Sequence, residues 1–215
     1  MVDWFLVRHG ESIANAEGRL QGRADSPLTA RGVEQARRLG AWCRAARITW
    51  DRVYSSPLVR ARDTAEIVLA SGRSRSGGVR LCPELEEISV GRLEGLRWSE
   101  LEVEFRSRGM KSPLVSGDYS DYGGESAADV QARVEAFVER AAGECAAPDE
   151  RVLLVAHGGL LRQFLRRLIA DTAVGSVAIR TGNCSISTVH VVAVGEALRG
   201  ELISHMPLEM ASVVV

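Results

Sequence analysis

Two histidines stand at points where apolar stretches of the chain stop. Residues 4–7 lead into Arg8-His9-Gly10, and residues 151–156 lead into His157-Gly158. A histidine after a buried strand, beside a planar guanidinium and a glycine that leaves the backbone room, suits attack on a phosphorus atom. A turn histidine bonded to backbone explains either one alone, yet two of the four histidines share this setting.

Uncharged donors and further arginines follow these strand ends. Ser12, Asn15, Gln21 and Gly22 come shortly after His9. Segment 55–65 predicts a strand leading into a helix, whose N-terminus favours anions through free backbone N–H groups and the helix dipole.

That helix carries two arginines, Arg60 and Arg62, in its first turns. They cannot face the same way on a helix. We therefore expect one to bind ligand and the other to pair with Asp63 or Glu66. Because Lys111 is the only lysine among 27 cations, arginine is common in this chain and a solvated face is the competing interpretation.

An acidic stretch with glycines, 84–95, is the remaining candidate. One of its carboxyl groups could donate a proton to the oxygen of a leaving group. Glu86 and Glu87 precede Gly91, and acidic runs are most often merely solvated.

The elements that must position these residues alternate between strands and helices. This order predicts an α/β fold: one domain over 1–215, a three-layer α/β/α sandwich with a mostly parallel central sheet and helices on both faces. Ligands in such sheets bind beyond the carboxyl ends of the strands. We predict strands at 4–7, 52–54, 151–156, 186–194 and 198–204, helices at 29–43, 58–69, 98–108, 127–141 and 160–169, a turn at 71–78 and a loop at 111–124.

Composition bounds the function classes. The chain has 215 residues, a mass of 23.3 kDa and a net charge of −1, so nothing predicts binding to nucleic acid or to a membrane. The N-terminus lacks a leader pattern, which predicts the cytoplasm. Four distant cysteines predict reduced thiols and no metal site. The apolar segment 206–215 is consistent with an edge strand or a homodimer contact.

Taken in order, six segments resemble the histidine phosphatase superfamily, which includes phosphoglycerate mutases and many small-metabolite phosphatases. The resemblance implies that His9 is the nucleophile that becomes phosphohistidine and that Arg8, Arg60 and His157 bind the phosphate. It implies Glu87 as the acid, with Glu86 as the competing assignment if that loop is shifted. The matching segments are 6–12, 25–29, 55–61, 91–95, 124–126 and 156–159.

The resemblance also implies the other contacts and the reaction. Asn15 matches a phosphate-pocket position, and Ser12, Gln21, Gly22 and the backbone of Gly158 are further phosphate-binding candidates. Adjacent arginines would keep His9 neutral while they neutralise phosphate charge.

The expected activity is metal-independent hydrolysis of a small phosphorylated metabolite, without a cofactor. A sugar phosphate, a phosphoglycerate derivative and a ribazole phosphate all remain open as substrates. A phosphoglycerate mutase is the alternative, but such mutases are usually longer between the acid loop and the second histidine, where residues 97–124 are short. A non-catalytic phosphate-binding module and a metal-dependent hydrolase are weaker alternatives, because all five candidate catalytic residues are present and no HExxH-like spacing occurs.

Overall fold

The computed structural model describes residues 2–107, 113–145, 147–169, 181–194 and 197–206. Its main sheet has six strands in the order β5-β3-β6-β1-β7-β8. The first four strands in this order are parallel, and β7 is antiparallel to both of its neighbours, β1 and β8, which confirms the predicted mostly parallel sheet. The strands are β1 (Val2–Arg8), β3 (Arg52–Ser55), β5 (Arg80–Leu81), β6 (Arg151–Ala156), β7 (Ile186–Val194) and β8 (Ala197–Met206).

Strand β6 lies between β3 and β1 in the parallel half of the sheet. Its Leu154 is paired with Leu6 of β1 on one side and with Tyr54 of β3 on the other. All residues of β6 after Arg151 are buried, because helices cover both faces of the sheet. This register brings the carboxyl ends of β1, β3 and β6 to the same edge.

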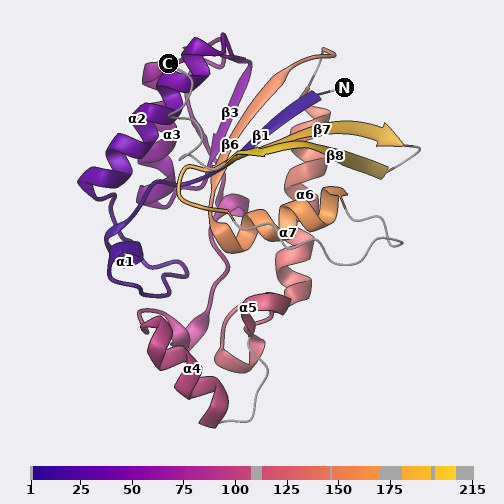
Figure 1. The fold of residues 1–215 in the computed structure, drawn as a ribbon. Helices are drawn as coiled ribbons and strands as arrows, with labels where there is room; N and C mark the ends of the chain where they lie inside the picture. The colour runs from indigo at the N-terminus through magenta and orange to yellow at the C-terminus, as the bar shows by residue number, and fades with distance from the viewer. Residues whose placement is uncertain (1, 108–112, 146, 170–180, 195–196, 207–215) are drawn as a thin grey trace.

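Two pairs of helices cover the sheet and confirm the three-layer arrangement (Figure 1). The apolar faces of α2 (Ala30–Ala45) and α3 (Val59–Ser71) pack with one set of strand residues. Those of α6 (Ala127–Gly143) and α7 (Gly158–Ile169) pack with the alternate set. Successive side chains of a strand point to opposite faces of the sheet, so alternate residues of one strand belong to different clusters.

Polar caps set where the helices begin. The Thr29 hydroxyl accepts from the Gly32 amide at the start of α2, the helix predicted over 29–43. Ser126 and Asp129 form a reciprocal capping box at the start of α6. Helix α7 begins at Gly158, two residues before the predicted boundary, so its first amides directly follow His157.

Beyond the carboxyl ends of the strands, short elements form a lobe that contains α1 (Ile13–Ala16), α4 (Trp98–Ser107) and α5 (Pro113–Ser116) (Figure 1). Three 3-10 turns lie at Pro83–Leu85, Gly91–Leu93 and Ser120–Tyr122. The interpretation of 111–124 as a loop is therefore wrong for α5 and the third turn. None of the helices in the described ranges is long and apolar enough to cross a membrane.

A second, two-stranded sheet corrects another expectation. Within the predicted turn 71–78, β4 (Arg73–Ser74) pairs in parallel with β2 (Thr49–Trp50). The Arg75 amide also donates to the Trp50 carbonyl. Residues 195–196, between the predicted strands 186–194 and 198–204, and the apolar tail from 207 onward lie outside the described residues.

Candidate active site

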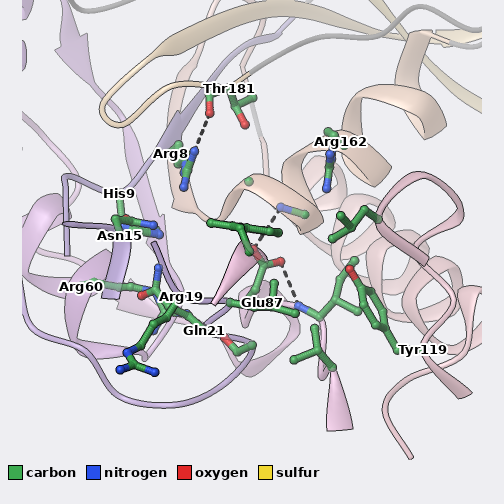
Figure 2. Close-up of a pocket in the computed structure, with 18 residues that line it drawn as sticks. Arg8, His9, Asn15, Arg19, Gln21, Arg60, Glu87, Tyr119, Arg162 and Thr181 are labelled. Carbon is green, nitrogen blue, oxygen red and sulfur yellow. Dashed lines mark hydrogen bonds between the residues drawn. The ribbon is translucent and has the colours of Figure 1, made fainter. Parts of the chain in front are cut away.

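The three strand ends meet around a cavity of about 270 Å³ (Figure 2). Strand β1 leads to His9, β3 leads into α3 with Arg60, and β6 leads to Gly158 at the start of α7. The cavity is lined by Arg8, His9, Asn15, Arg19, Leu20, Gln21, Gly22, Arg60, Glu87, Ile88, Val90, Trp98, Leu114, Tyr119, Gly158, Gly159, Arg162 and Thr181.

His9 is held as a neutral ring with one free nitrogen. Its Nδ1 lies 2.7 Å from the Gly10 carbonyl oxygen. Because a carbonyl only accepts, Nδ1 carries the proton and Nε2 keeps its lone pair. Burial, followed by the charges of Arg8 and Arg60, holds the pKa of His9 well below its ordinary value of 6.5. The ring is therefore neutral at physiological pH.

Gly10 lets this turn close against α2. A Cβ at Gly10 would lie 2.5 Å from the carbonyl oxygen of Gly32. The Gly10 amide donates to Thr64 Oγ1 at 3.0 Å, and Asn183 Nδ2 donates to the His9 carbonyl at 3.0 Å. Neither Thr64 nor Asn183 was singled out from the sequence, because nothing in their spacing marks a contact with His9.

Arg8 carries a buried donor that has no partner among the described residues. Its Nη1 donates to the Thr181 carbonyl at 2.7 Å, but its buried Nε makes no hydrogen bond with them. A Cβ at Gly158 would lie 3.4 Å from that Nε. Burial lowers the pKa of Arg8 from its ordinary value. An orphaned guanidinium donor of this kind is what a bound anion would satisfy.

Arg60 is the arginine that faces the cavity, which settles the alternative left open between Arg60 and Arg62. Arg60 is fully buried, and its Nη1 and Nη2 donate to the carbonyls of Ala24 and Gly22 at 2.8 Å each. Arg62 instead pairs with Asp63 at 2.8 Å. Two residues along a helix turn the side chain by about 200°, so the two arginines point apart.

His157 lies behind the cavity wall rather than on it. Arg60 Nε donates to its Nδ1 at 3.2 Å, so Nε2 carries the proton and donates to Ser56 Oγ at 2.8 Å. The ring centroids of His9 and His157 are 5.1 Å apart. Burial, then Arg60 and His9, holds the pKa of His157 well below 6.5. In this arrangement His157 supports Arg60, and Ser56, whose role the sequence did not reveal, orients His157.

Asn15 and Gln21 line the cavity, but Ser12 does not. Ser12 is the N-cap of α1 and is fully buried, and its hydroxyl donates to Gln21 Oε1 at 2.8 Å. Asn15 Oδ1 accepts from Asn183 Nδ2 at 3.1 Å. With both amide oxygens engaged, the amide nitrogens of Asn15 and Gln21 are the donors left for a ligand. Ser12, expected to contact phosphate, orients these two amides instead.

Glu87 forms the opposite wall, at the start of α7 (Figure 2). Its Oε1 accepts from the amides of Ile88 and Leu160 at 2.9 Å each, and its Oε2 accepts from the Gly159 amide at 3.0 Å. Glu86, the competing assignment, pairs with Arg23 at 3.3 Å and does not line the cavity. Adjacent residues of this irregular segment point in different directions, so Glu87 faces the cavity while Glu86 does not.

The outer wall adds residues that the sequence did not assign. Arg162 lies four residues after Gly158 on α7, one helical turn away, and this spacing could have revealed it. Trp98 and Tyr119 also line the cavity. Tyr122 is buried in the core.

The arrangement can attract and hold a phosphate dianion. Neither Arg8 nor Arg60 makes an ion pair with a carboxylate in the described part of the chain, so their charge is available to a ligand. Within the same residues, no three His, Cys, Asp or Glu side chains converge as metal ligands do.

Comparisons with known proteins identify the family of the chain. The model of the histidine phosphatase superfamily (branch 1) matches residues 4–200. A probable phosphoglycerate mutase GpmB of Salmonella paratyphi A is 36% identical over 193 residues, which cover 88% of this chain and 85% of that protein.

Two solved structures are also similar. A putative alpha-ribazole-5'-P phosphatase from Escherichia coli has 29% identity and a TM-score of 0.74, with 94% of this chain and 96% of that chain covered. A mycobacterial glucosyl-3-phosphoglycerate phosphatase in complex with VO3 has 28% identity and a TM-score of 0.74, with 93% and 96% covered. The chain therefore belongs to branch 1 of the histidine phosphatase superfamily.

Proposed function

We propose that this protein is a metal-independent phosphomonoesterase that acts on a small phosphorylated metabolite through a phosphohistidine on His9. The observation that carries the proposal is the state of His9: a neutral, buried imidazole whose Nε2 lone pair is free. It lies beside the guanidinium of Arg8, whose buried Nε has no hydrogen-bond partner in the part of the chain that the structure describes.

The reaction has two steps. In the first, His9 Nε2 forms a bond to phosphorus, the ester P–O bond breaks, and Glu87 gives its proton to the departing oxygen. In the second, Glu87 takes a proton from water, whose oxygen attacks phosphorus and breaks the P–N bond. Inorganic phosphate leaves, and His9 and the protonated Glu87 are restored.

Several groups would stabilise the charge on the transferring phosphoryl group. Arg8, Arg60 and the amide nitrogens of Asn15 and Gln21 surround one side of the cavity. The amide of Gly158 belongs to the same wall. Preorganised donors of this kind typically contribute about 10²–10³ in rate each. His157 acts through Arg60, because its Nδ1 accepts a hydrogen bond from Arg60 Nε.

Hydrolysis is favoured over phosphoryl return to a sugar acid by the short segment 97–124, which follows the acid loop. Two similar solved structures carry phosphatase names, for a ribazole phosphate and for a glucosyl phosphoglycerate. A mutase is the second candidate, because the relative that is 36% identical is named a probable phosphoglycerate mutase.

The test is a rapid-quench assay with p-nitrophenyl phosphate in EDTA, using the wild type, His9→Ala and Glu87→Gln. Turnover with an acid-labile phosphoenzyme that His9→Ala lacks is the expected result. Unimpaired turnover of His9→Ala would overturn the mechanism.

A second assay separates the two candidate activities. The protein is incubated with 3-phosphoglycerate in the presence and absence of 2,3-bisphosphoglycerate, and both inorganic phosphate and 2-phosphoglycerate are measured. Release of phosphate supports the phosphatase. Formation of 2-phosphoglycerate that depends on the bisphosphate would replace it with the mutase.

A further inference from the structure

The segment that carries Glu87 has no regular structure of its own. Residues 86–90 lie between the 3-10 turns Pro83–Leu85 and Gly91–Leu93. No ladder of backbone hydrogen bonds fixes their conformation. The carbonyl and amide groups of such a segment must find partners elsewhere, and those partners decide where the Glu87 carboxyl group points.

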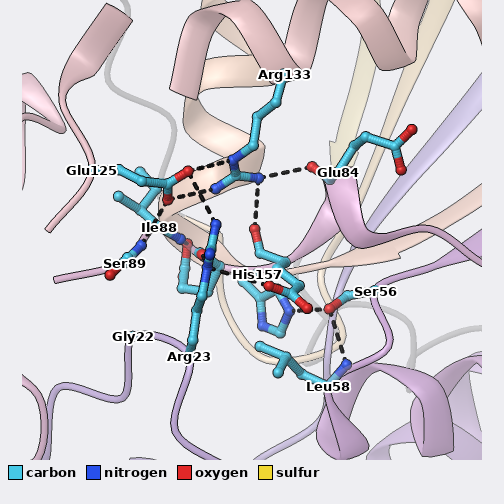
Figure 3. Close-up of polar contacts among 12 residues, drawn as sticks. Gly22, Arg23, Ser56, Leu58, Glu84, Ile88, Ser89, Glu125, Arg133 and His157 are labelled. Carbon is cyan, nitrogen blue, oxygen red and sulfur yellow. Dashed lines mark hydrogen bonds and ion pairs between the residues drawn. The ribbon is translucent and has the colours of Figure 1, made fainter. Parts of the chain in front are cut away.

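Arg133, on α6, supplies two of these partners (Figure 3). Its Nη1 donates to the carbonyl oxygens of Glu84 and Glu86 at 2.7 and 2.8 Å, on the residues that precede Glu87. The side chain is only 14% exposed. This half-buried guanidinium thus fixes the backbone on the N-terminal side of Glu87, although Arg133 does not line the cavity.

Glu125 fixes the other side of the segment. Its carboxylate is held by the fork of Arg133, with Nε to Oε1 at 2.8 Å and Nη2 to Oε2 at 3.0 Å. Its Oε2 also accepts from the Ser89 amide at 2.8 Å, while its own amide donates to the Ser89 carbonyl at 2.9 Å. Arg133 and Glu125 therefore bind the backbone both before and after Glu87.

The charge state of Glu125 fits this task. Burial by itself raises the pKa of Glu125, but hydrogen bonds from Arg133 and Ser89 and the charges of Arg133 and Arg23 outweigh it and hold that pKa below its ordinary value. Arg23 adds a third contact, from its Nε to the Glu87 carbonyl at 3.3 Å. Glu125 is therefore ionised near neutral pH, which keeps the bidentate pair with Arg133 intact.

We infer that Arg133 and Glu125 are a positioning pair that holds Glu87 where it can protonate the leaving group, without touching the substrate. The inference rests on the proposed role of Glu87 as the acid. Proton transfer requires the donor within hydrogen-bond reach of the departing oxygen, so a shift of about 1 Å costs about 10²-fold in rate. A purely structural role would instead change all reactions of the protein alike.

Leaving-group dependence separates these roles. An alkyl phosphate needs a proton as its alkoxide departs, whereas 2,4-dinitrophenyl phosphate releases a stable phenolate without one. Arg133→Lys keeps the charge beside Glu125 but loses the planar fork. Glu87 also takes a proton from water when the phosphohistidine is hydrolysed, a step common to both esters, so the quantity compared is kcat/KM, which reports phosphorylation of His9 alone. We expect Arg133→Lys to lower kcat/KM for glycerol phosphate by about 10–10²-fold, with kcat/KM for the dinitrophenyl ester nearly unchanged. Glu87→Gln should show the same selectivity with a larger loss, about 10²–10⁴-fold.

Arg140→Met is the matched control. Arg140 is on the same helix and binds the same segment, but through the Glu84 side chain at 2.9 Å rather than through the backbone. Both of its rates should remain close to those of the wild type. Glu125→Gln is a second probe of the pair, since the Gln side chain is nearly isosteric and accepts from Ser89, but it lacks the charge that binds Arg133.

The outcomes are distinct. An equal loss on both esters in Arg133→Lys would reduce the pair to a structural role and overturn the inference. If Glu87→Gln itself lacks leaving-group selectivity, the proposed acid is wrong and the positioning role falls with it. The supporting result includes Arg133→Lys/Glu87→Gln, which should be no slower on glycerol phosphate than Glu87→Gln alone.

Discussion

The two buried histidines show how single hydrogen bonds define chemistry at the scale of a residue. A carbonyl at Nδ1 of His9 and a guanidinium at Nδ1 of His157 select opposite tautomers of the same side chain. The apolar runs before them were enough to predict both positions. The tautomers were not predictable, because the partners Gly10 and Arg60 are chosen by the fold rather than by local sequence.

The same histidines give the protein a characteristic pH dependence of stability. Burial holds both pKa values well below 6.5, so below about pH 6.5 the unfolded chain binds protons that the folded chain does not. The free energy of unfolding should therefore fall as pH drops from 7 to 5.5. Urea unfolding at both pH values measures it. His9→Asn removes one of the two groups and should show a smaller drop, whereas an equal drop would contradict this explanation.

Arg60 and Arg62 provide a matched pair of substitutions on α3. Arg60→Lys keeps a charge but cannot bind both the Gly22 and Ala24 carbonyls and a phosphate, so kcat should fall by about 10²–10³-fold. Arg62→Met removes an exposed ion pair with Asp63 and should leave kcat within about twofold of the wild type. Steady-state assays of both variants decide the matter, and similar losses would contradict the assignment of Arg60.

At the scale of elements, the sequence predicted the core of the fold and left the lobe uncertain. Strands β1 and β6 and helices α2 and α6 have clear apolar patterns, and each lies close to its predicted range. The segments around the 3-10 turns have no such period, because their backbones are held by side chains from elsewhere. The choice between Glu86 and Glu87 therefore needed the contacts of Arg133, Glu125 and Arg23.

Close packing of the acid segment against the lobe predicts a glycine requirement. Gly91 has a φ of +56°, and a Cβ there would lie 2.0 Å from the Tyr122 carbonyl oxygen. Gly95 has a φ of +82° but open space around it. Gly95→Ala should cost about 1–2 kcal/mol of stability from φ alone. Gly91→Ala should cost more and should lower kcat by displacing Glu87. Denaturant unfolding and kinetics test both, and equal costs would mean that the contact with Tyr122 relaxes freely.

At the scale of the whole molecule, a small net charge conceals arginines in two different settings, some paired with carboxylates and some not. The net charge is −1, yet exposed arginines such as Arg38 and Arg62 are paired with Glu34 and Asp63, while Arg8 has no carboxylate partner among the described ion pairs. Burial penalises the charge of Arg8 in the folded state. The folded protein therefore carries an unfavourable buried charge, which is what the proposed phosphate-binding role of Arg8 would require.

Because the buried charge of Arg8 is unfavourable, we predict that bound phosphate and the substitution Arg8→Met both change the stability of the protein. Inorganic phosphate at about 100 times its Kd should add about 2.7 kcal/mol to the free energy of unfolding, or about 5–10 °C in Tm. Arg8→Met removes the orphaned Nε, so its Tm without phosphate should equal or exceed that of the wild type, and its response to phosphate should be largely lost. Thermal unfolding with phosphate and with sodium chloride of equal ionic strength measures both effects. A full phosphate response in Arg8→Met would show that the anion binds elsewhere, because only an anion at the Arg8 guanidinium can relieve its buried charge.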